Sequence, residues 1–358
     1  MPITSYDFQN QVRDVVPLLD YVNQNNPKLI SKIAAGAIAK NKTHEWTEGI
    51  LAGKKVAGTG DGAGITVESA AGLAIGMKLQ PVASADVYVI IGISGNELTI
   101  QKLDSKMANP PSAKTTYKVY GAAVVSGSKT GEEVAWQGKT RVNYTQIFRK
   151  DASLTGTAVA TSTYDNANNM NTQVMNAMEL LQNDLNFAIW HGRKGIGGAG
   201  VASTMGGLYE FCNAIVEDAD DEALSVDKIN AVIAKIVKAG GKPNTIVMAR
   251  DLAPAVSNLY KDQVIIGEDS NVRGMYVNKI KDAFGNILDV VYDDEVPAGH
   301  LWIMDINKVK LSPMDGRTFT DADSTLPGFD GFSRTIIGEY TLEVYNPDEA
   351  FGRIENIG

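Results

Sequence analysis

The chain has 358 residues, of which 44% are hydrophobic, so it can bury a sizeable core, and its length suggests about two domains. Its net charge of -9 argues against a protein whose main role is to grip nucleic acid, because phosphate binding needs clustered Lys and Arg. No apolar run reaches the ~18 residues that cross a bilayer, and the first residues carry no secretory signal. The single cysteine, Cys212, cannot form an intrachain disulfide, which fits synthesis in a reducing cytoplasm.

Residues 1–43 are predicted to form an N-terminal arm. Apolar residues recur at helical spacing before residue 20, but Pro17 and Pro27 interrupt the pattern, and proline inside a helix costs ~3 kcal/mol. Residues 28–38 are predicted to form one small helix. Because the arm has few large apolar side chains, we expect it to lie on another subunit or on the main body.

Residues 44–140 are predicted to form an extended loop that carries an inserted β module over residues 56–124. The module opens with the glycine-rich run Gly58–Gly64. Alternating apolar residues predict short strands at residues 65–67, 77–79, 87–90 and 97–100. The sequence Ser94-Gly95-Asn96-Glu97 predicts a hairpin between the last two. We expect a small barrel without a pocket, and a carbohydrate- or partner-binding role is the alternative.

Residues 141–204 combine a β-type run with a long helix. Residues 141–148 are predicted to form one strand. Asn166, Asn168 and Asn169 are suitable N-cap residues for the helix, and Gly192 is expected to end it in the left-handed conformation. At 1.5 Å per residue, ~25 residues span roughly 37 Å. The helix is predicted over about residues 166–191 from an apolar stripe at steps of three and four, namely Met170, Val174, Ala177, Met178, Leu181, Leu185, Ala188 and Ile189.

Residues 205–330 have the pattern of an α/β domain. Its predicted elements are a helix over 229–237 that stops at Gly240-Gly241, strands over 245–249, 287–292 and 301–306, and a helix over 251–260. Residues 331–358 contain a further predicted strand, over 335–345. We expect this strand to return to the sheet that residues 134–150 begin.

Two fragments imitate nucleotide-binding motifs. Residues Gly195–Gly200 satisfy GxGxxG, but the dinucleotide motif requires a strand before it and a helix after it, and here a helix precedes it. Residues 133–140 approach a P-loop, except that Glu133 replaces the first glycine. A carboxylate at that position would repel phosphate. Both fragments are interpreted as loops.

Other reactive residues show no catalytic or metal-binding spacing. His44, His191 and His300 are scattered along the sequence, and Cys212 has no local nucleophile signature. The acidic run over residues 217–222 lacks the ligand spacing and the glycine of a calcium loop. The sequence therefore predicts no catalytic residue, no cofactor and no metal site, and a protein that is not an enzyme.

The order and the amino-acid sequences of the segments between Val134 and Leu208 resemble those of the major capsid proteins of tailed bacteriophages, which have the Hong Kong 97-like fold. The β-type run Arg141–Phe148 leads into the long helix, which ends at His191-Gly192 and opens into Met205-Gly206-Gly207-Leu208. The resemblance implies an α+β fold with an N-terminal arm and an extended loop. It also implies a peripheral domain (residues 141–204) with a long spine helix, an axial α/β domain (residues 205–330) and a C-terminal strand (residues 331–358) that returns to the peripheral domain.

The resemblance also selects candidates for structural or interface roles. Glu45 and Trp46 resemble the base of the extended loop, and Arg141, Tyr144 and Phe148 belong to its return strand. From the helical stripe, Leu181 and Leu185 are candidates for packing inside the spine helix.

The resemblance implies a protein that assembles with itself, as hexameric and pentameric capsomers, into an icosahedral-type shell. That shell encloses double-stranded DNA without sequence-specific binding, and the further partners implied are a portal protein and decoration or scaffolding proteins, with no membrane. The protein is then expected in the virion, after synthesis in the host bacterial cytoplasm. Two alternatives remain open: an encapsulin-like compartment shell, and a soluble α/β enzyme with its site in residues 205–330.

Overall fold

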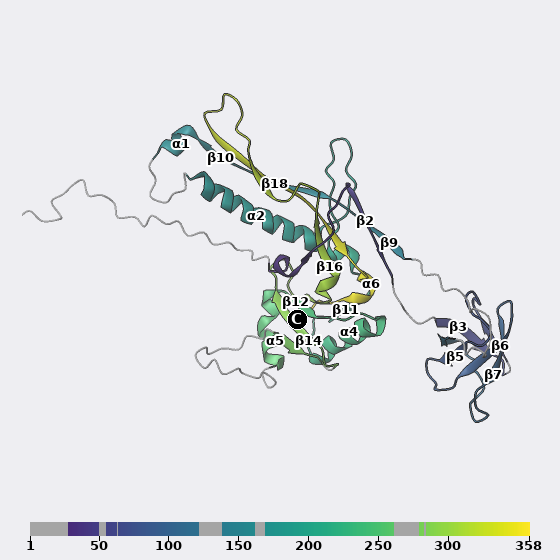
Figure 1. Ribbon diagram of the computed structural model, residues 1–358. Coiled ribbons are helices and arrows are strands. Elements are labelled where there is room, and N and C mark those ends of the chain that lie inside the picture. The colour runs from purple at the N-terminus through teal and green to yellow at the C-terminus, as the bar shows by residue number, and fades with distance from the viewer. Residues whose placement is uncertain are drawn as a thin grey trace, which may run out of the picture. The chain divides into compact units, whose positions relative to one another are not determined.

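The computed structural model describes residues 28–49, 55–62, 64–121, 138–161, 169–260, 279–282 and 284–358. The chain divides into two compact units: residues 49–138 form one, and residues 1–48 together with 139–358 form the other (Figure 1). We refer to residues 49–138 as the inserted unit and to the remainder as the main unit. The inserted unit falls within the loop expected over residues 44–140.

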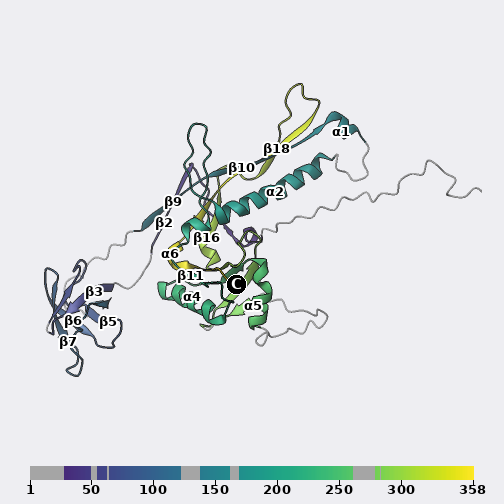
Figure 2. The ribbon, with the colours of Figure 1, turned by 180° about the vertical axis from the view of Figure 1, so that it is seen from behind.

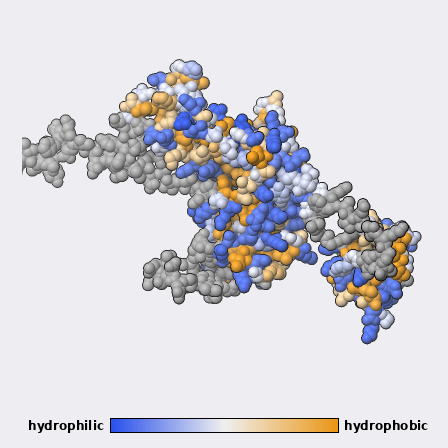
Figure 3. Space-filling view, in the orientation of Figure 1, coloured by the Kyte–Doolittle hydropathy of each residue, from blue (hydrophilic) through white to orange (hydrophobic). Residues whose placement is uncertain are grey.

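The inserted unit is a closed six-stranded barrel with the strand order β3-β4-β7-β6-β5-β8. Its strands are β3 (Lys55–Gly60), β4 (Gly64–Val67), β5 (Lys78–Pro81), β6 (Tyr88–Ser94), β7 (Glu97–Lys102) and β8 (Thr115–Tyr120). All four predicted strands are present, and the hairpin at Gly95, whose φ is +59°, is confirmed. Leu79, Tyr88 and Tyr117 are completely buried inside the barrel. Figure 3 shows that hydrophobic surface also remains on the visible face of this unit.

The first part of the glycine-rich run, up to Gly60, belongs to strand β3, which the sequence did not predict. A Cβ on Gly58 would lie 2.9 Å from Ile65 on β4, and one on Gly60 would lie 2.6 Å from Pro110. The glycines therefore let β3 approach its neighbours closely. Glycine-rich runs usually indicate turns, so this use of glycine is visible only in the folded barrel.

The first sheet of the main unit has five strands, in the order β1-β16-β18-β10 with β17 paired to β18. Their bounds are β1 (Ala34–Ala35), β10 (Gln146–Thr155), β16 (Val309–Pro313), β17 (Thr320–Asp323) and β18 (Gly331–Val344). Strand β18 pairs antiparallel with β10 over the whole of β10, from Gln146↔Tyr340 to Thr155↔Gly331. The predicted return of the C-terminal strand to this sheet is confirmed.

The single strand predicted over residues 141–148 is wrong, because the chain changes partner at Thr145. Strand β9 (Lys139–Tyr144) pairs with β2 (Thr43–Glu48), whereas β10 pairs with β18. The Thr145 N–H donates to the Lys42 carbonyl at 2.9 Å, and its hydroxyl donates to Glu339 Oε1 at 2.6 Å. Thr145 is thus fixed between the β2–β9 pair and the first sheet.

The predicted long helix is α2 (Met170–His191), and it lies along β10 and β18 in both ribbon views (Figures 1 and 2). Asn169 caps its start by accepting from the Asn171 N–H at 2.9 Å, and residues 166–168 lie outside the described part of the chain. The left-handed end predicted at Gly192 is wrong, since Gly192 has φ -52° and ψ 142°. Glycine is required there for another reason: a Cβ would meet the carbonyl oxygens of Ala188 and Met205 at about 2.4–2.5 Å.

The small helix predicted over residues 28–38 is also wrong. Only a 3₁₀ turn, η2 (Ile30–Lys32), forms, and β1 then pairs parallel with β16. Leu29 is fully buried, and its N–H donates to Asp293 Oδ2 at 3.1 Å. This tertiary pairing overrides a weak local helix preference.

The buried carboxylate of Asp293 also holds α2. Asn186 is buried on the helix, and its Nδ2 donates to Asp293 Oδ1 at 2.8 Å. A carboxylate in place of Asn186 would face Asp293 without a proton to donate. The helix and the segment around Leu29 thus meet at one buried acid.

The second sheet of the main unit has six strands, in the order β11-β19-β15-β12-β14-β13. They are β11 (Val216–Asp218), β12 (Thr245–Met248), β13 (Lys279–Lys281), β14 (Ile287–Tyr292), β15 (Leu301–Met304) and β19 (Phe351–Glu355). Strands predicted over 245–249, 287–292 and 301–306 are present, the last ending at Met304. Of the described helices, none is long and apolar enough to cross a membrane.

Helices and short turns surround the two sheets. They are α1 (Gly156–Ala160), α3 (Leu208–Phe211), α4 (Val226–Ala239), η3 (Arg250–Leu252), α5 (Ala253–Tyr260), η4 (Ile306–Lys308) and α6 (Pro347–Ala350). The predicted helices over 229–237 and 251–260 correspond to α4 and to η3 with α5. As predicted, α4 stops at Gly240, which adopts the left-handed conformation with φ +101°.

Three strands belong to a different sheet from the one that the predicted domain boundaries implied. Strands β16 and β17 belong to the first sheet, although residues 205–330 were expected to form a separate α/β domain. Strand β19 adds to the second sheet, although residues 331–358 were expected to return to the first. The chain crosses between the sheets at η4 and after β18, where Asn346 has the left-handed conformation with a φ of +50°.

Leu181 provides a test of the core beneath α2, because its side chain is fully buried while the neighbouring Gln182 is exposed. We expect Leu181→Asp to lower the free energy of unfolding by about 3–5 kcal/mol, since it buries an unpaired charge. Gln182→Asp should change it by less than about 1 kcal/mol. Urea unfolding of the two variants measures the difference, and equal tolerance of both changes would contradict the packing described.

Candidate functional site

Strands β2 and β9 form a two-stranded hairpin stem through which the chain leaves the main unit for residues 49–138 and returns. We call this stem, residues 43–48 with residues 139–144, the hairpin root. Its ladder runs from Thr43↔Tyr144 to Glu48↔Lys139. Trp46 and Glu48 are buried and Glu45 is exposed, so alternate residues of β2 face the core.

Trp46 anchors the hairpin root to the hydrophobic core. It is 5% exposed, its ring lies 6.0 Å from that of Phe211 and 6.1 Å from that of Tyr345, and Nε1 donates to the Val344 carbonyl at 3.2 Å. The apolar ring is thereby buried while its one polar atom is satisfied, the arrangement that a buried tryptophan requires.

Arg141 lies opposite Trp46 in the ladder and connects the hairpin root to α6. Its Nε donates to Glu48 Oε1 at 2.5 Å, and its Nη2 donates to Asp348 Oδ2 at 2.6 Å. Burial by itself lowers the pKa of Arg141, but the hydrogen bonds to these two carboxylates outweigh it and raise the pKa. Glu48 also accepts from the Asn346 N–H at 2.7 Å, so the charges meet where β18 ends and α6 begins.

Glu343 is the second charged group that holds the hairpin root, and it comes from β18. Its Oε1 accepts from His44 Nε2 at 2.7 Å and from the Ser312 hydroxyl at 2.5 Å. The Tyr345 hydroxyl donates to Oε2 at 2.9 Å. Burial raises the pKa of Glu343, but the hydrogen bonds from His44, Ser312 and Tyr345 outweigh it and lower the pKa to about 2. One carboxylate thus joins β2, β16 and β18.

Asn143 joins the hairpin root to the glycine-rich segment that follows α2. It is fully buried, and its Nδ2 donates to the carbonyls of Gly206 at 3.1 Å and Leu342 at 2.7 Å. Its Oδ1 accepts from the Gly206 N–H at 2.7 Å. Tyr144, the last residue of β9, is half-buried beside it.

The structure places the predicted candidates in different surroundings. Four of them, Trp46, Phe148, Leu181 and Leu185, lie in one hydrophobic core. Arg141 lies at the edge of this core and Glu45 faces solvent. Sequence reasoning missed Glu48, Asn143 and Glu343, each of which hydrogen-bonds to a residue that is distant in sequence. The one local signal was a charged residue in the apolar run Leu342-Glu343-Val344.

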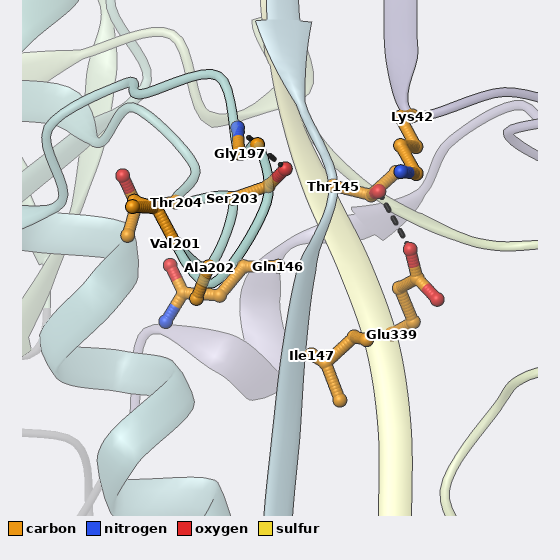
Figure 4. A pocket seen from close by; sticks show the side chains of 11 residues that line it. Lys42, Thr145, Gln146, Ile147, Gly197, Val201, Ala202, Ser203, Thr204 and Glu339 are labelled. Carbon is orange, nitrogen blue, oxygen red and sulfur yellow. Dashed lines mark hydrogen bonds between the residues drawn. The ribbon is translucent and has the colours of Figure 1, made fainter.

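A pocket of about 340 Å³ lies beside the hairpin root, between the start of β10 and the loop after α2 (Figure 4). Figure 4 shows Thr145 donating to Glu339 at 2.6 Å and the Gly197 N–H donating to Ser203 Oγ at 3.0 Å. Lys42 also lines it. These groups can form hydrogen bonds with a peptide or another polar surface.

The loop that carries the GxGxxG sequence folds back on itself. Gly195 pairs with Thr204 and Gly198 pairs with Val201, and the segment follows α2. It therefore lacks the preceding strand that a dinucleotide site requires. The P-loop-like sequence starts at Glu133, and residues 133–137 lie outside the described part of the chain. Within the described residues, no three His, Cys, Asp or Glu side chains lie close enough to hold a metal ion.

Comparison with known proteins relates this architecture to viral shells. The family model described as "SU10 major capsid protein" matches residues 2–358. Among solved structures, the chain is similar to the Cyanophage A-1(L) capsid asymmetric unit, with 13% identity, a TM-score of 0.57, and 99% of this chain and 98% of that chain covered. It is also similar to the capsid of Myoviridae phage XM1, with 10% identity, a TM-score of 0.52, and 96% and 97% covered.

A third similar structure, from Mycobacterium phage Bobi, has 11% identity and a TM-score of 0.51, with 100% of both chains covered. The comparison with curated protein sequences finds no match. At these identities the structural likeness concerns the fold, and the predicted α+β fold of the Hong Kong 97-like type is confirmed.

The depressed pKa of Glu343 predicts how acid acts on the hairpin root. A carboxylate whose pKa is about 2 in the folded chain, against a usual 4.5, stabilises the fold above pH ~4.5 and loses that contribution as the pH falls toward 2. We expect Glu343→Gln to flatten the fall in unfolding free energy over this range by on the order of 2 kcal/mol. Urea unfolding of unassembled subunits between pH 5 and about pH 2 measures it.

Glu45→Gln is the matched control, because Glu45 follows His44 on β2 and has its side chain in solvent. It should leave the pH dependence unchanged. A Glu343→Gln variant with the same acid dependence as the native chain would show that this carboxylate does not hold the root.

Proposed function

Because the chain belongs to the SU10 major capsid protein family, we propose that its copies assemble as hexameric and pentameric capsomers into the shell of a tailed phage. The protein is a major capsid protein, and the match over residues 2–358 is the observation that carries the proposal. It favours a virion shell over the two alternatives that the sequence left open, an encapsulin-like compartment and a soluble α/β enzyme.

The hairpin root gives this function a physical basis. A shell requires contacts that extend beyond each subunit, and stable obligate interfaces bury roughly 2,000 Å² or more. The root is fixed by Trp46, Arg141 and Glu343, so the chain leaves the main unit from a rigid base. Residues 49–138 then form a compact unit of their own. Such an insertion supplies contact surface to a neighbouring copy without disturbing the core of either.

The proposed relation to DNA is enclosure without sequence-specific contact. The net charge of -9 argues against clustered phosphate binding as the basis of the function. An acidic shell adheres weakly to its contents, which suits a container that must release its genome. A portal protein and decoration or scaffolding proteins complete the proposed set of partners, and the proposed location is the virion, after synthesis in the host cytoplasm.

We also propose that the role is structural rather than catalytic. Cys212 is buried, and burial raises the pKa of its thiol well above the ordinary value, so it is a poor nucleophile. His44 and His300 hydrogen-bond to Glu343 and to Tyr209, respectively, within the fold.

Electron microscopy of the purified chain tests the proposed function. Closed shells or ring-shaped capsomers are expected, and small discrete oligomers at every concentration would contradict it. Nucleic-acid content and protein composition of particles from infected cells then separate the phage shell from a compartment shell: the former contains DNA and a portal protein.

Replacing residues 55–121 with a short Gly/Ser connection tests the inserted unit. We expect the main unit to keep its fold, because the two units are separately compact. Shells of the shortened chain should lose integrity at a lower temperature than native shells, since contacts between copies are removed. Circular dichroism of subunits and calorimetry of shells measure the two effects, and unchanged shell melting would show that the inserted unit contributes no contact.

A further inference from the structure

Strand β10 has one open edge. It lies at the end of the first sheet, with β18 on one side and, within the described residues, no strand on the other. It is ten residues long, from Gln146 to Thr155. A long exposed edge is a template for another strand unless it is covered or blunted.

The hydrogen bonds of β18 determine which backbone groups of β10 face the open edge. The Glu339 carbonyl accepts from the Met314 N–H at 2.9 Å, and its N–H donates to the Arg317 carbonyl at 2.9 Å. Glu339 therefore directs its backbone groups away from Ile147, its partner on β10. In an antiparallel pair of this kind, the facing residue does the same. The N–H and C=O of Ile147 thus point outward.

The other end of the strand gives the same result. The Ser333 carbonyl accepts from the Ser324 N–H at 2.9 Å, away from its β10 partner Ser153. Because the pattern repeats every second residue, four residues of β10 direct both backbone groups to the open edge: Ile147, Arg149, Asp151 and Ser153. All four are exposed, and in the described part of the chain no turn or loop pairs with their backbone.

There is room beside this edge for another strand. A cavity of about 540 Å³ lies between the first half of β10 and the C-terminal half of α2. Its lining includes Ile147 and Arg149 on the strand and Phe187 on the helix. Ile147 is 54% exposed and Phe187 55%, so the edge combines open hydrogen-bonding groups with apolar surface.

The charges on the edge are self-complementary. Arg149 and Asp151 share the outer face of β10, with Nε and Oδ1 3.0 Å apart. If a second copy of β10 runs antiparallel with Lys150 opposite its own equivalent, each Arg149 faces an Asp151 of the other copy. A shift of two residues either way places like charges opposite one another, which destabilises a sheet. The sequence thus favours one register.

We propose that β10 pairs antiparallel with β10 of a second copy, in the register centred on Lys150, so that two first sheets become continuous across a two-fold contact. Each facing pair of outward residues exchanges two backbone hydrogen bonds. Lys150 lies on the other face of the strand, with Nζ 2.8 Å from Asp184 Oδ2, which offsets the meeting of two lysines. The proposal rests on the proposed shell function in that the second copy is a neighbour in the shell.

Charge reversal and rescue between copies test the pairing. Arg149→Asp leaves two acidic residues at these positions and Asp151→Arg leaves two basic ones, so each variant faces like charge in its own copies. We expect each alone to weaken the contact by roughly tenfold and to give few closed shells. Co-expression of the two should restore shells, because opposite charges then face one another between copies while each chain keeps its internal repulsion.

Shell yield by sedimentation and electron microscopy is the readout. If either variant alone assembles like the native chain, or if the mixture assembles no better than each alone, the pairing is overturned. Circular dichroism confirms that the variants are folded. Shells of the native chain are the reference in this experiment. If the native chain forms no shells, the proposed function is refuted, and this result is distinct from a failure of the variants alone.

A disulfide test does not depend on assembly yield. In the proposed register the two Lys150 positions form a non-hydrogen-bonded pair with Cα atoms about 4.5 Å apart, within disulfide range. Lys150→Cys shells should yield disulfide-linked dimers on oxidation, whereas Ser153→Cys shells should not, since position 153 faces position 147. The native Cys212 is buried and gives no background. If Lys150→Cys shells form no disulfide-linked dimer, for example because another segment covers the edge, the proposal is overturned. Equal amounts of dimer from both variants would overturn it as well.

Discussion

The pairing of β18 with neighbours on both sides is the constraint on which the rest of the main unit depends. Over its fourteen residues, β18 pairs with β10 on one side and with β17 and then β16 on the other. Its carboxyl end supplies the Val344 carbonyl to Trp46 and the Glu343 carboxylate to His44. The chain then crosses to the second sheet through α6 and β19. Because these partners are distant in sequence, the sheet, the packing of α2 and the position of the hairpin root must form together.

Buried polar side chains determine where the segments meet. Glu343, Asp293 and Asn143 lie in the interior, and each receives or donates hydrogen bonds from at least two separate segments. A buried carboxylate without donors costs several kcal/mol, so each acid is compatible only with the arrangement that supplies its donors. Apolar contacts alone would tolerate more than one path for residues 28–39 and for the hairpin. The polar groups select one path: Asp293 fixes the segment around Leu29, and Asn143 and Glu343 fix the hairpin root.

The division of the chain into two compact units suits a major capsid protein. Among the described residues, the main unit contains the first sheet, the second sheet and the two-stranded hairpin root, together with two hydrophobic cores, and the inserted unit has a core of its own inside the barrel. A separate core lets the insertion fold without help from the main unit, so its surface is free to serve contacts between copies. The open edge of β10 adds a second type of contact, made by backbone groups rather than by side chains. Closed symmetric assemblies require surfaces that are complementary to one another in this way.

The sequence by itself determined the elements whose signals are local. The apolar stripe of α2, the apolar runs of β12 and β15, the hairpin at Gly95 and the end of α4 at Gly240 follow from periodicity and turn chemistry within a few residues. Through resemblance to a known family, the sequence also predicts Glu45 and Trp46 at the base of the extended loop and Arg141 in its return strand. Only the tertiary structure decided the break at Thr145, the strand character of β1 and β3, and the roles of Asn143 and Glu343. In each of these cases the structure is decided by a hydrogen bond or a close contact with another segment. The local sequence does not indicate which segment will lie beside it in the fold.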